Sequence, residues 1–244
     1  ARVALVALTR NGGVCSNVGC IPTKALLRSA EVYRTLSRAA AFGLRVEGEI
    51  VADWPAIQAR KQSVVQTLVS GVEKLLAKAG VRVVRGRGRL AGARTLHIET
   101  TASSERVEAA NIVIATGSRP ARLPLPGFDL PGVLDSTGLL ALDTLPCRLL
   151  IVGGGVIGVE FADVFGALGV QVTVVEMLDR LLPLMDADLG AGLAWTLGQR
   201  GVQVHVSSRV ARIEPAAGGL RAAVGTPAGE LSIEADRVLV AVGR

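Results

Sequence analysis

Residues 149–176 read LLIVGGGVIGVEFADVFGALGVQVTVVE, and this stretch decides the fold of the chain. Four apolar residues typical of a buried parallel strand come first, and a glycine turn and an apolar helix pattern follow them. A second strand is expected at 171–175 and ends on Glu176. The order strand, G-x-G-x-x-G, helix, strand, acid predicts a βαβ unit that binds a dinucleotide.

The glycines of this unit have separate physical roles. Gly153 permits the turn, Gly155 lets the backbone approach a pyrophosphate, and Gly158 lets the helix pack closely on the strand. The N-terminus of the following helix carries the partial positive charge that anions prefer. Glu176 is expected to accept hydrogen bonds from both ribose hydroxyls and to repel a 2′-phosphate, which favours NAD over NADP. The motif alone does not distinguish NAD from FAD, and a glycine-rich packing turn is its alternative.

A second motif, GGVCSNVGCIPTK at 12–24, places Cys15 and Cys20 at the start of a predicted helix. This helix is expected to begin near Cys20 and to run to about residue 41, with Pro22 in its first turn. A regular helix would hold the two Cα atoms too far apart for a disulfide, so bridging needs a distortion that Gly19 can supply. The positive end of the helix would favour a thiolate.

Other interpretations of the cysteine pair stay open at this point. On spacing alone, a structural disulfide or two inert thiols explain the pair as well as redox chemistry does. A zinc site is disfavoured because the third cysteine, Cys147, and the two histidines, His97 and His205, do not stand at ligand spacing. No metal site is therefore predicted.

Composition limits the class of protein. The 244 residues are enough for two modest domains, and a hydrophobic content of 50% with only 3% aromatic residues predicts an aliphatic core of an α/β enzyme. The longest uncharged apolar run, 149–159, is too short to span a bilayer, so no membrane segment is predicted. Scattered arginines and scarce aromatics disfavour nucleic acid as the partner despite a net charge of +6. Scarce cysteine indicates a reducing cytoplasm.

Hydrophobic periodicity and turn residues predict the remaining elements. Helices are expected at 54–79, 159–168 and 186–200. Strands are expected at 2–8, 81–84, 95–99, 111–115, 149–152, 171–175, 202–206, 209–213, 220–224 and 237–242.

The two motifs, in this order, resemble those of the pyridine nucleotide-disulfide oxidoreductases, and the closest likeness is to members that oxidise dihydrolipoamide. The matching segments are 12–24, IATGSRP at 114–120, GGGVIGVE at 153–160, VVEM at 174–177 and VAVGR at 240–244. The resemblance implies an α/β fold with two Rossmann-like three-layer nucleotide-binding domains, each with a small antiparallel β-meander. Residues 1–145 would form an incomplete FAD-binding domain with the redox disulfide, and 146–244 the NAD-binding domain.

The resemblance also assigns roles to side chains. Cys20 would face the flavin as the charge-transfer thiolate, and Cys15 would exchange with the substrate disulfide. Lys24 would lie against the flavin, with Glu160 as its carboxylate partner beside the nicotinamide. We therefore expect Lys24 and Glu160 to approach each other across the two domains. The plain alternative is an exposed helix lysine and an ordinary helix glutamate.

The cofactor contacts implied by the resemblance form two sets. Those for FAD are Gly13, Lys24, Gly88, Thr116, Gly117 and Ser118. Those for NAD are Gly153, Gly154, Gly155, Val156, Ile157, Gly158, Val159, Glu160, Glu176, Val210 and Gly243.

The implied reaction is oxidation of dihydrolipoamide to lipoamide with NAD⁺, through a Cys15–Cys20 disulfide and FAD. The implied partner is a lipoyl carrier domain of a 2-oxo acid dehydrogenase complex, and the full-length protein would be a homodimer. A relative similar to mercuric or glutathione reductase is one alternative. A non-enzymatic dinucleotide-binding module with a structural disulfide is the other.

Departures from the family pattern at both ends and at two residues lead us to expect a truncated and inactive piece. The strand and glycine turn that hold the FAD pyrophosphate would lie upstream of the first residue. Ala7 stands where an acid for the FAD ribose is expected, and Ser16 replaces an apolar residue. An interface domain with a His-Glu pair would follow the last residue, and neither His97 nor His205 fits that role.

Overall fold

The computed structural model describes residues 2–244, which divide into two compact units. One unit contains residues 2–21 and 62–118, and the other contains 22–61 and 119–244. These units do not coincide with the predicted cofactor domains at 1–145 and 146–244. The assignment of cofactors to those domains stays a prediction.

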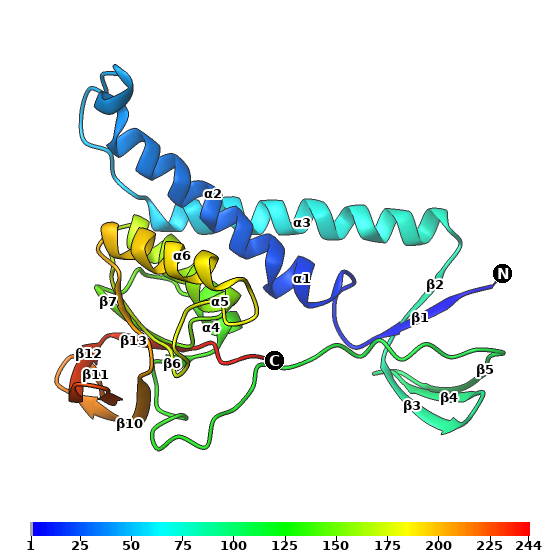
Figure 1. Ribbon diagram of the computed structural model, residues 1–244. Coiled ribbons are helices and arrows are strands. Elements are labelled where there is room, and N and C mark those ends of the chain that lie inside the picture. Colours follow the sequence, from blue (N-terminus) through cyan, green and yellow to red (C-terminus); the bar gives the residue numbers. More distant parts are fainter. Residues whose placement is uncertain (1) are drawn as a thin grey trace. The chain divides into compact units, whose positions relative to one another are not determined.

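A parallel sheet of five strands organises the second unit (Figure 1). Its order is β6-β13-β7-β8-β9, and every neighbouring pair in it is parallel. The strands span Val133–Leu134 (β6), Arg148–Val152 (β7), Gln171–Val175 (β8), Gln203–His205 (β9) and Arg237–Val240 (β13). An antiparallel meander β10-β11-β12 accompanies this sheet, at Arg209–Ala216, Gly219–Thr226 and Gly229–Ala235.

The five-stranded sheet buries both of its faces, which explains its nearly continuous apolar strands. Successive residues of a strand point to opposite faces. Leu149 and Ile151 of β7 pack in the core shared with the helices, whereas Leu150 and Val152 pack in the core shared with the meander. The unit therefore has three layers, with helices, parallel sheet and antiparallel meander in that order.

The helical layer consists of α5 (Val156–Ala167), α6 (Ala187–Gln199) and parts of α2 (Cys20–Ser37) and α3 (Trp54–Lys78). Phe161 and Phe165 of α5 are its largest fully buried side chains. The Phe165 ring lies 5.8 Å from the Trp54 ring and 6.2 Å from the Phe161 ring, measured between centroids. Such aromatic contacts contribute stabilisation beyond their buried area.

The first turns of α3 are attached by hydrogen bonds to the short helix α4 (Ser136–Leu140) and the residues after it. Trp54 Nε1 donates to the carbonyl of Leu142 at 2.9 Å, and Gln58 Nε2 donates to the same oxygen at 3.0 Å. Buried Lys61 donates to the carbonyl of Leu140 at 2.5 Å, and its burial lowers the pKa of its ammonium. Lys61 thus satisfies a carbonyl that the end of α4 leaves unpaired.

The first unit contains a parallel pair and an antiparallel meander. Strand β1 (Ala4–Ala7) pairs with β2 (Arg82–Arg85), and the meander is β3-β4-β5 at Arg87–Gly92, Thr95–Glu99 and Ser104–Glu108. The short helix α1 (Gly13–Val18) of this unit precedes α2. In the second unit, a 3-10 turn at Ala39–Phe42 follows α2. The predicted mixed α/β fold with two meanders is confirmed.

One predicted strand is wrong: residues 111–115 form neither helix nor strand. A strand needs a neighbour for its backbone hydrogen bonds, and nothing within residues 2–244 pairs with this segment. Val113 and Ile114 are consequently 87% and 69% exposed. The helix expected to reach residue 41 ends earlier, at Ser37.

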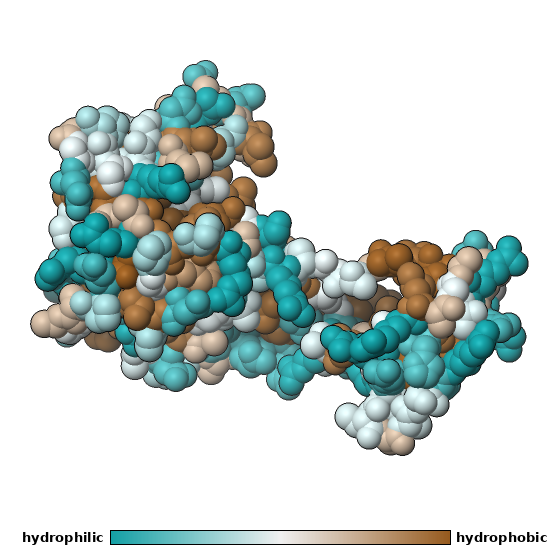
Figure 2. Space-filling model, turned by 90° about the horizontal axis from the view of Figure 1, so that it is seen from below, coloured by the Kyte–Doolittle hydropathy of each residue, from teal (hydrophilic) through white to brown (hydrophobic). Residues whose placement is uncertain are grey.

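Apolar side chains also occupy part of the surface, as the brown areas of Figure 2 show. The most exposed large hydrophobic residue is Leu184, with an exposed fraction of 99%. None of the helices in residues 2–244 combines the length and the hydropathy that a bilayer span requires.

Truncation of the aromatic core should be costly. We expect Phe165→Ala to lower the free energy of unfolding by about 3–5 kcal/mol, because it removes a fully buried ring and leaves a cavity. Leu184→Ala is the matched control and should change it by about 0.5 kcal/mol or less, since that side chain is exposed. Denaturant unfolding of the two variants measures both values, and equal losses would contradict this core.

Candidate functional site

The three motif glycines differ in what surrounds them. Gly153 has φ +112°, and a Cβ there would lie 2.5 Å from the carbonyl oxygen of Ala241. A Cβ on Gly158 would lie 2.0 Å from the carbonyl oxygen of Gly153, so the approach of α5 to the strand requires glycine. Gly155 has φ −73° and no atom within 4 Å of a Cβ position. The protein's own packing therefore leaves open space at Gly155, which is suitable for a close ligand.

Glu176 closes the turn from the end of β8. Its side chain is buried, and its Oε2 accepts the N–H of Gly154 at 2.6 Å while Oε1 accepts the N–H of Leu178 at 2.8 Å. A carboxylate oxygen can accept more than one hydrogen bond, so the group can still receive ribose hydroxyls. Glu176 thus acts as a clip for the glycine turn as well as a candidate ribose acceptor.

A loop after Glu176 supports the turn from the other side, and sequence reasoning missed it. Leu181 is fully buried, and its Cδ2 would lie 2.4 Å from a Cβ on Gly154. The N–H of Leu182 donates to the carbonyl of Gly154 at 2.9 Å. Both ends of Gly154 are therefore held by hydrogen bonds, which fixes the direction of this part of the turn.

Helix α5 begins directly after Gly155 and has the predicted contacts Val156, Ile157 and Val159 in its first turns. Val159 is buried and Val156 is exposed. The backbone N–H groups of the first turn of a helix have no acceptor within the helix, so this end suits an anion.

Lys24 of α2 and Glu160 of α5 form an ion pair. The predicted approach of these two side chains is confirmed, although both belong to the second compact unit. The Glu160 side chain is 20% exposed and the Lys24 side chain 59%. Their expected positions beside cofactors stay predictions.

The cysteine pair lies on either side of a helix break. Cys15 belongs to α1, Cys20 is the first residue of α2, and Gly19 between the helices has non-helical backbone angles. The predicted interruption at Gly19 is therefore present, and Cys15 lies in a short helix that the sequence did not indicate. Both cysteines are exposed, as a thiol that exchanges with a substrate must be.

Two side chains that sequence reasoning did not single out shape the turn before Cys15. Gly12 and Gly13 both have positive φ, at 98° and 62°. Asn17 Nδ2 donates to the carbonyls of Asn11 at 3.0 Å and Gly13 at 2.8 Å, and Arg85 Nη1 donates to Asn11 Oδ1 at 3.2 Å. The position of Asn17 between the two cysteines is the feature of the sequence that could have indicated its hydrogen bonds to this turn.

The other predicted cofactor residues occupy varied positions. Gly88 lies in β3, Thr116, Gly117 and Ser118 lie outside helices and strands, and Val210 is buried in β10. Gly13, Gly117 and Gly243 have positive φ and open space where a Cβ would stand. Lys24 belongs to the second unit and the other predicted FAD contacts to the first.

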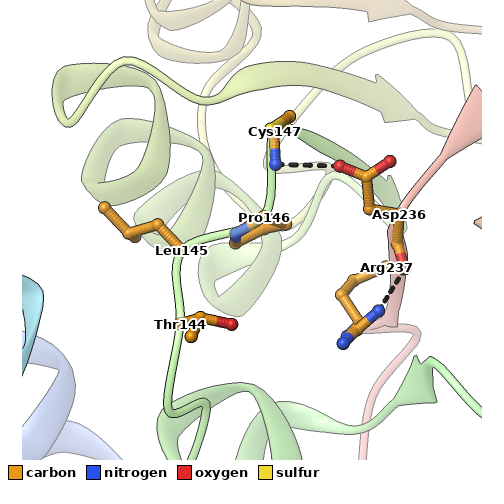
Figure 3. A pocket seen from close by; sticks show the side chains of 6 residues that line it. All are labelled: Thr144, Leu145, Pro146, Cys147, Asp236 and Arg237. Carbon is orange, nitrogen blue, oxygen red and sulfur yellow. Dashed lines mark hydrogen bonds between the residues drawn. The ribbon is translucent and has the colours of Figure 1, made fainter.

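A pocket of about 200 Å³ lies near Cys147, at the start of β7 (Figure 3). Asp236 accepts the N–H of Cys147 at 2.8 Å and the N–H of Arg148 at 2.9 Å, and its Oδ1 accepts Arg148 Nη2 at 2.9 Å. Burial raises the pKa of Asp236, but these hydrogen bonds outweigh it and leave a lowered pKa. The carboxylate therefore connects the start of β7 to the start of β13, and its role is structural.

The histidines do not gather with other potential ligands. His97 Nδ1 lies 3.9 Å from Glu99 Oε1, and His205 is a strand residue of β9. Within residues 2–244, no group of three histidine, cysteine or acidic side chains could hold a metal ion.

Comparisons with known proteins agree with this geometry. The profile of the family described as "Pyridine nucleotide-disulphide oxidoreductase" matches residues 1–244. A dihydrolipoyl dehydrogenase of Bacillus subtilis is 43% identical over 243 residues, which cover 99% of this chain and 53% of that protein. The crystal structure of LpdA from Mycobacterium tuberculosis has a TM-score of 0.87 at 30% identity and covers 99% of this chain and 52% of that one. The structure of the flavoprotein disulfide reductase RclA of Escherichia coli has a TM-score of 0.82 at 32% identity and covers 100% of this chain and 51% of that one.

The chain thus spans about half the length of these relatives.

The Asp236 contacts predict a pH-dependent contribution to stability. A carboxyl group with a lowered folded-state pKa stabilises the fold above its unfolded value, and this contribution is lost as the pH falls through the folded value. Asp236→Asn should therefore lower the denaturant midpoint at neutral pH, and the difference from wild type should shrink below the ordinary pKa of 3.8. Exposed Asp179→Asn is the control. A difference that does not depend on pH would contradict this account.

Proposed function

The chain belongs to the pyridine nucleotide-disulphide oxidoreductase family, and from that membership we propose that it carries the thiol pair and the NAD site of a flavoenzyme that oxidises dihydrolipoamide. Enzymes of this family use FAD and NAD(H). The observation that carries the proposal is the exposed pair Cys15 and Cys20, separated by the helix break at Gly19. The name of the Bacillus relative supports the choice of substrate.

The thiol steps follow from disulfide exchange. A thiolate of dihydrolipoamide attacks Sγ of Cys15 in a Cys15–Cys20 disulfide, and Cys20 leaves as a thiolate. The second substrate thiol then displaces Cys15, which leaves with a proton, and the substrate becomes a cyclic disulfide. The substrate has then lost two electrons, which reside on the cysteine pair. Cys20, the leaving thiolate, is the first residue of α2.

The glycine turn is proposed to hold NAD. The pyrophosphate would approach the backbone at Gly155 and receive N–H groups from the first turn of α5. Glu176 would accept the ribose hydroxyls, and its negative charge would disfavour a 2′-phosphate. The clip between Glu176 and Gly154 keeps this carboxylate in place before the ligand arrives.

FAD, if bound, would accept the two electrons and the proton of the cysteine pair and supply them to NAD⁺ as a hydride, and the one proton released overall is lost when the first substrate thiol ionises. The open backbone at Gly13 and Gly117 fits close contact with such a group. Lys24 would then place its ammonium near the flavin, and Glu160 would hold that ammonium in position.

The proposed partner is a lipoyl carrier domain of a 2-oxo acid dehydrogenase complex, with a homodimer as the full-length enzyme and a reducing cytoplasm as its location. A glutathione or mercuric reductase-like relative is the second candidate, since the name of RclA specifies only a disulfide reductase. The buried Glu176 favours the NAD-dependent enzyme over an NADP-dependent one.

Substitution of the cysteines in the full-length protein tests the proposed reaction. Wild type should reduce NAD⁺ with dihydrolipoamide, and Cys15→Ser and Cys20→Ser should each lower kcat by about a thousandfold or more, because each thiol is required for exchange. Cys147→Ser is the control and should retain activity. A Cys15→Ser enzyme with normal kcat, or a preference for NADPH and glutathione disulfide, would overturn the proposal.

The glycine turn gives a second test, which separates ligand contact from packing. Gly155→Ala should leave the melting temperature unchanged and weaken NAD binding by about tenfold or more, because its Cβ would enter only the open space kept for the ligand. Gly158→Ala should lower the melting temperature, since its Cβ would overlap the Gly153 carbonyl. Calorimetric titration and thermal unfolding measure the two effects. Unchanged NAD affinity in Gly155→Ala would exclude this turn as the site.

A further inference from the structure

Two sets of charged side chains connect α2 to α5 within the second unit. The first is the ion pair of Lys24 with Glu160. The second is centred on Asp163 of α5, whose Oδ1 lies 2.8 Å from Arg34 Nη2 and 2.5 Å from Arg200 Nη1. Arg34 belongs to α2, and Arg200 follows the last residue of α6. Asp163 therefore joins three helices.

The contact of Asp163 with Arg34 is shielded from solvent more than an ordinary surface pair. The side chains of Arg34 and Asp163 are 23% and 24% exposed. The pair of Arg28 and Glu31, on α2 itself, is 61% exposed at both residues. Fully exposed pairs contribute little, and partial burial strengthens the attraction when both charges are satisfied. Arg34 Nη2 also reaches the backbone carbonyl of Asp163 at 3.4 Å.

The spacing of these charges opposes movement of α2 along its own axis. At about 1.5 Å per residue, the Cα atoms of Lys24 and Arg34 stand about 15 Å apart along α2. Glu160 and Asp163 are neighbours on one face of α5, with Cα atoms only about 5 Å apart. Lys24 and Arg34 therefore attach α2 to α5 at two points about 15 Å apart along α2. A shift of α2 along its axis would displace both cations from their carboxylates.

The apolar contacts of α2 do not provide this constraint. Leu26 and Ala30 are fully buried in the core that contains Phe161 and Phe165. The free energy of apolar burial depends on the buried area and has no preferred direction. It therefore keeps α2 against the core but selects no single position of α2 along its axis. Charge-assisted hydrogen bonds have a defined geometry and can select that position.

We propose that Asp163 is a positioning residue, which with Arg34 and Arg200 fixes α2 along α5 and so keeps Lys24 paired with Glu160. Cys20 is the first residue of the same helix, and Lys24 follows it by one turn. The consequence for catalysis rests on the proposed function, in which Lys24 and Cys20 act at the flavin. The consequence for the Lys24–Glu160 contact does not.

Chemical labelling of Lys24 in the full-length holoprotein tests the contact directly. An ammonium held by a carboxylate is less available to acetic anhydride than a released one, so Asp163→Asn should raise the acetylation rate of Lys24 by about threefold or more. Glu160→Gln gives the rate of a fully released lysine. Glu31→Gln removes an equal charge from α2 without touching α5 and should leave the rate unchanged. Mass spectrometry of the peptide that contains Lys24 provides the measurement.

Kinetics and flavin absorption test the effect on catalysis. Asp163→Asn should lower kcat by about tenfold and change the visible flavin spectrum, while KM for NAD⁺ stays within about twofold, because the glycine turn is intact. Arg34→Lys keeps the charge and should fall between Asp163→Asn and wild type. If Asp163→Asn fails to fold, Arg34→Gln replaces it in both experiments.

The outcomes separate the two proposals. An unchanged Lys24 acetylation rate in Asp163→Asn, or an equal rise in Glu31→Gln, overturns the positioning role whatever the activity. A lower melting temperature with unchanged labelling, kcat and flavin spectrum also overturns it, because it marks a purely structural contact. A wild-type enzyme that does not oxidise dihydrolipoamide refutes the proposed function, and the labelling result still decides the role of Asp163.

Discussion

The close approach of α5 to the residue that follows β7, and of that residue to the segment after β13, is the constraint on which the second unit depends. It exists because Gly158 and Gly153 have no side chains, and a Cβ on either would lie within 2.5 Å of a backbone carbonyl oxygen. This approach determines where the first turn of α5 lies and therefore where its unpaired N–H groups are. It also sets the positions of Glu160 and Asp163 further along the helix. The candidate nucleotide site and the contacts to α2 thus have one common origin.

The parallel sheet provides the rigid base for this arrangement. Its strands bury alternate residues in two separate cores, one with the helices and one with the meander β10-β11-β12. Glu176 stands at the end of β8, where its carboxylate reaches back to Gly154. Side chains at the carboxyl ends of parallel strands are held by the whole sheet, which suits a site that must be formed before its ligand binds.

The cysteine pair depends on a different kind of constraint. A continuous helix would separate Cys15 from Cys20, and the break at Gly19 divides the segment into α1 and α2. Two side chains hold the preceding turn. Asn17 donates to the carbonyls of Asn11 and Gly13, and Arg85 donates to the carbonyl of Thr9 and the side chain of Asn11. The thiols are therefore carried on defined backbone although both are exposed. Exposure and a fixed backbone together are what disulfide exchange requires.

The sequence by itself determined the βαβ unit, the cysteine motif and the helices, predicted at 54–79 and 186–200, because their signals are local. Glycine spacing, an apolar run and a terminal acid lie within one short stretch. Only the tertiary structure decided that 111–115 is not a strand and that the polar segments β3, β5 and β12 are strands. It also decided that Asp163 joins Arg34 and Arg200. Strand pairing and ion pairs depend on which distant segments meet in space, and periodicity within one segment carries no information about its neighbour.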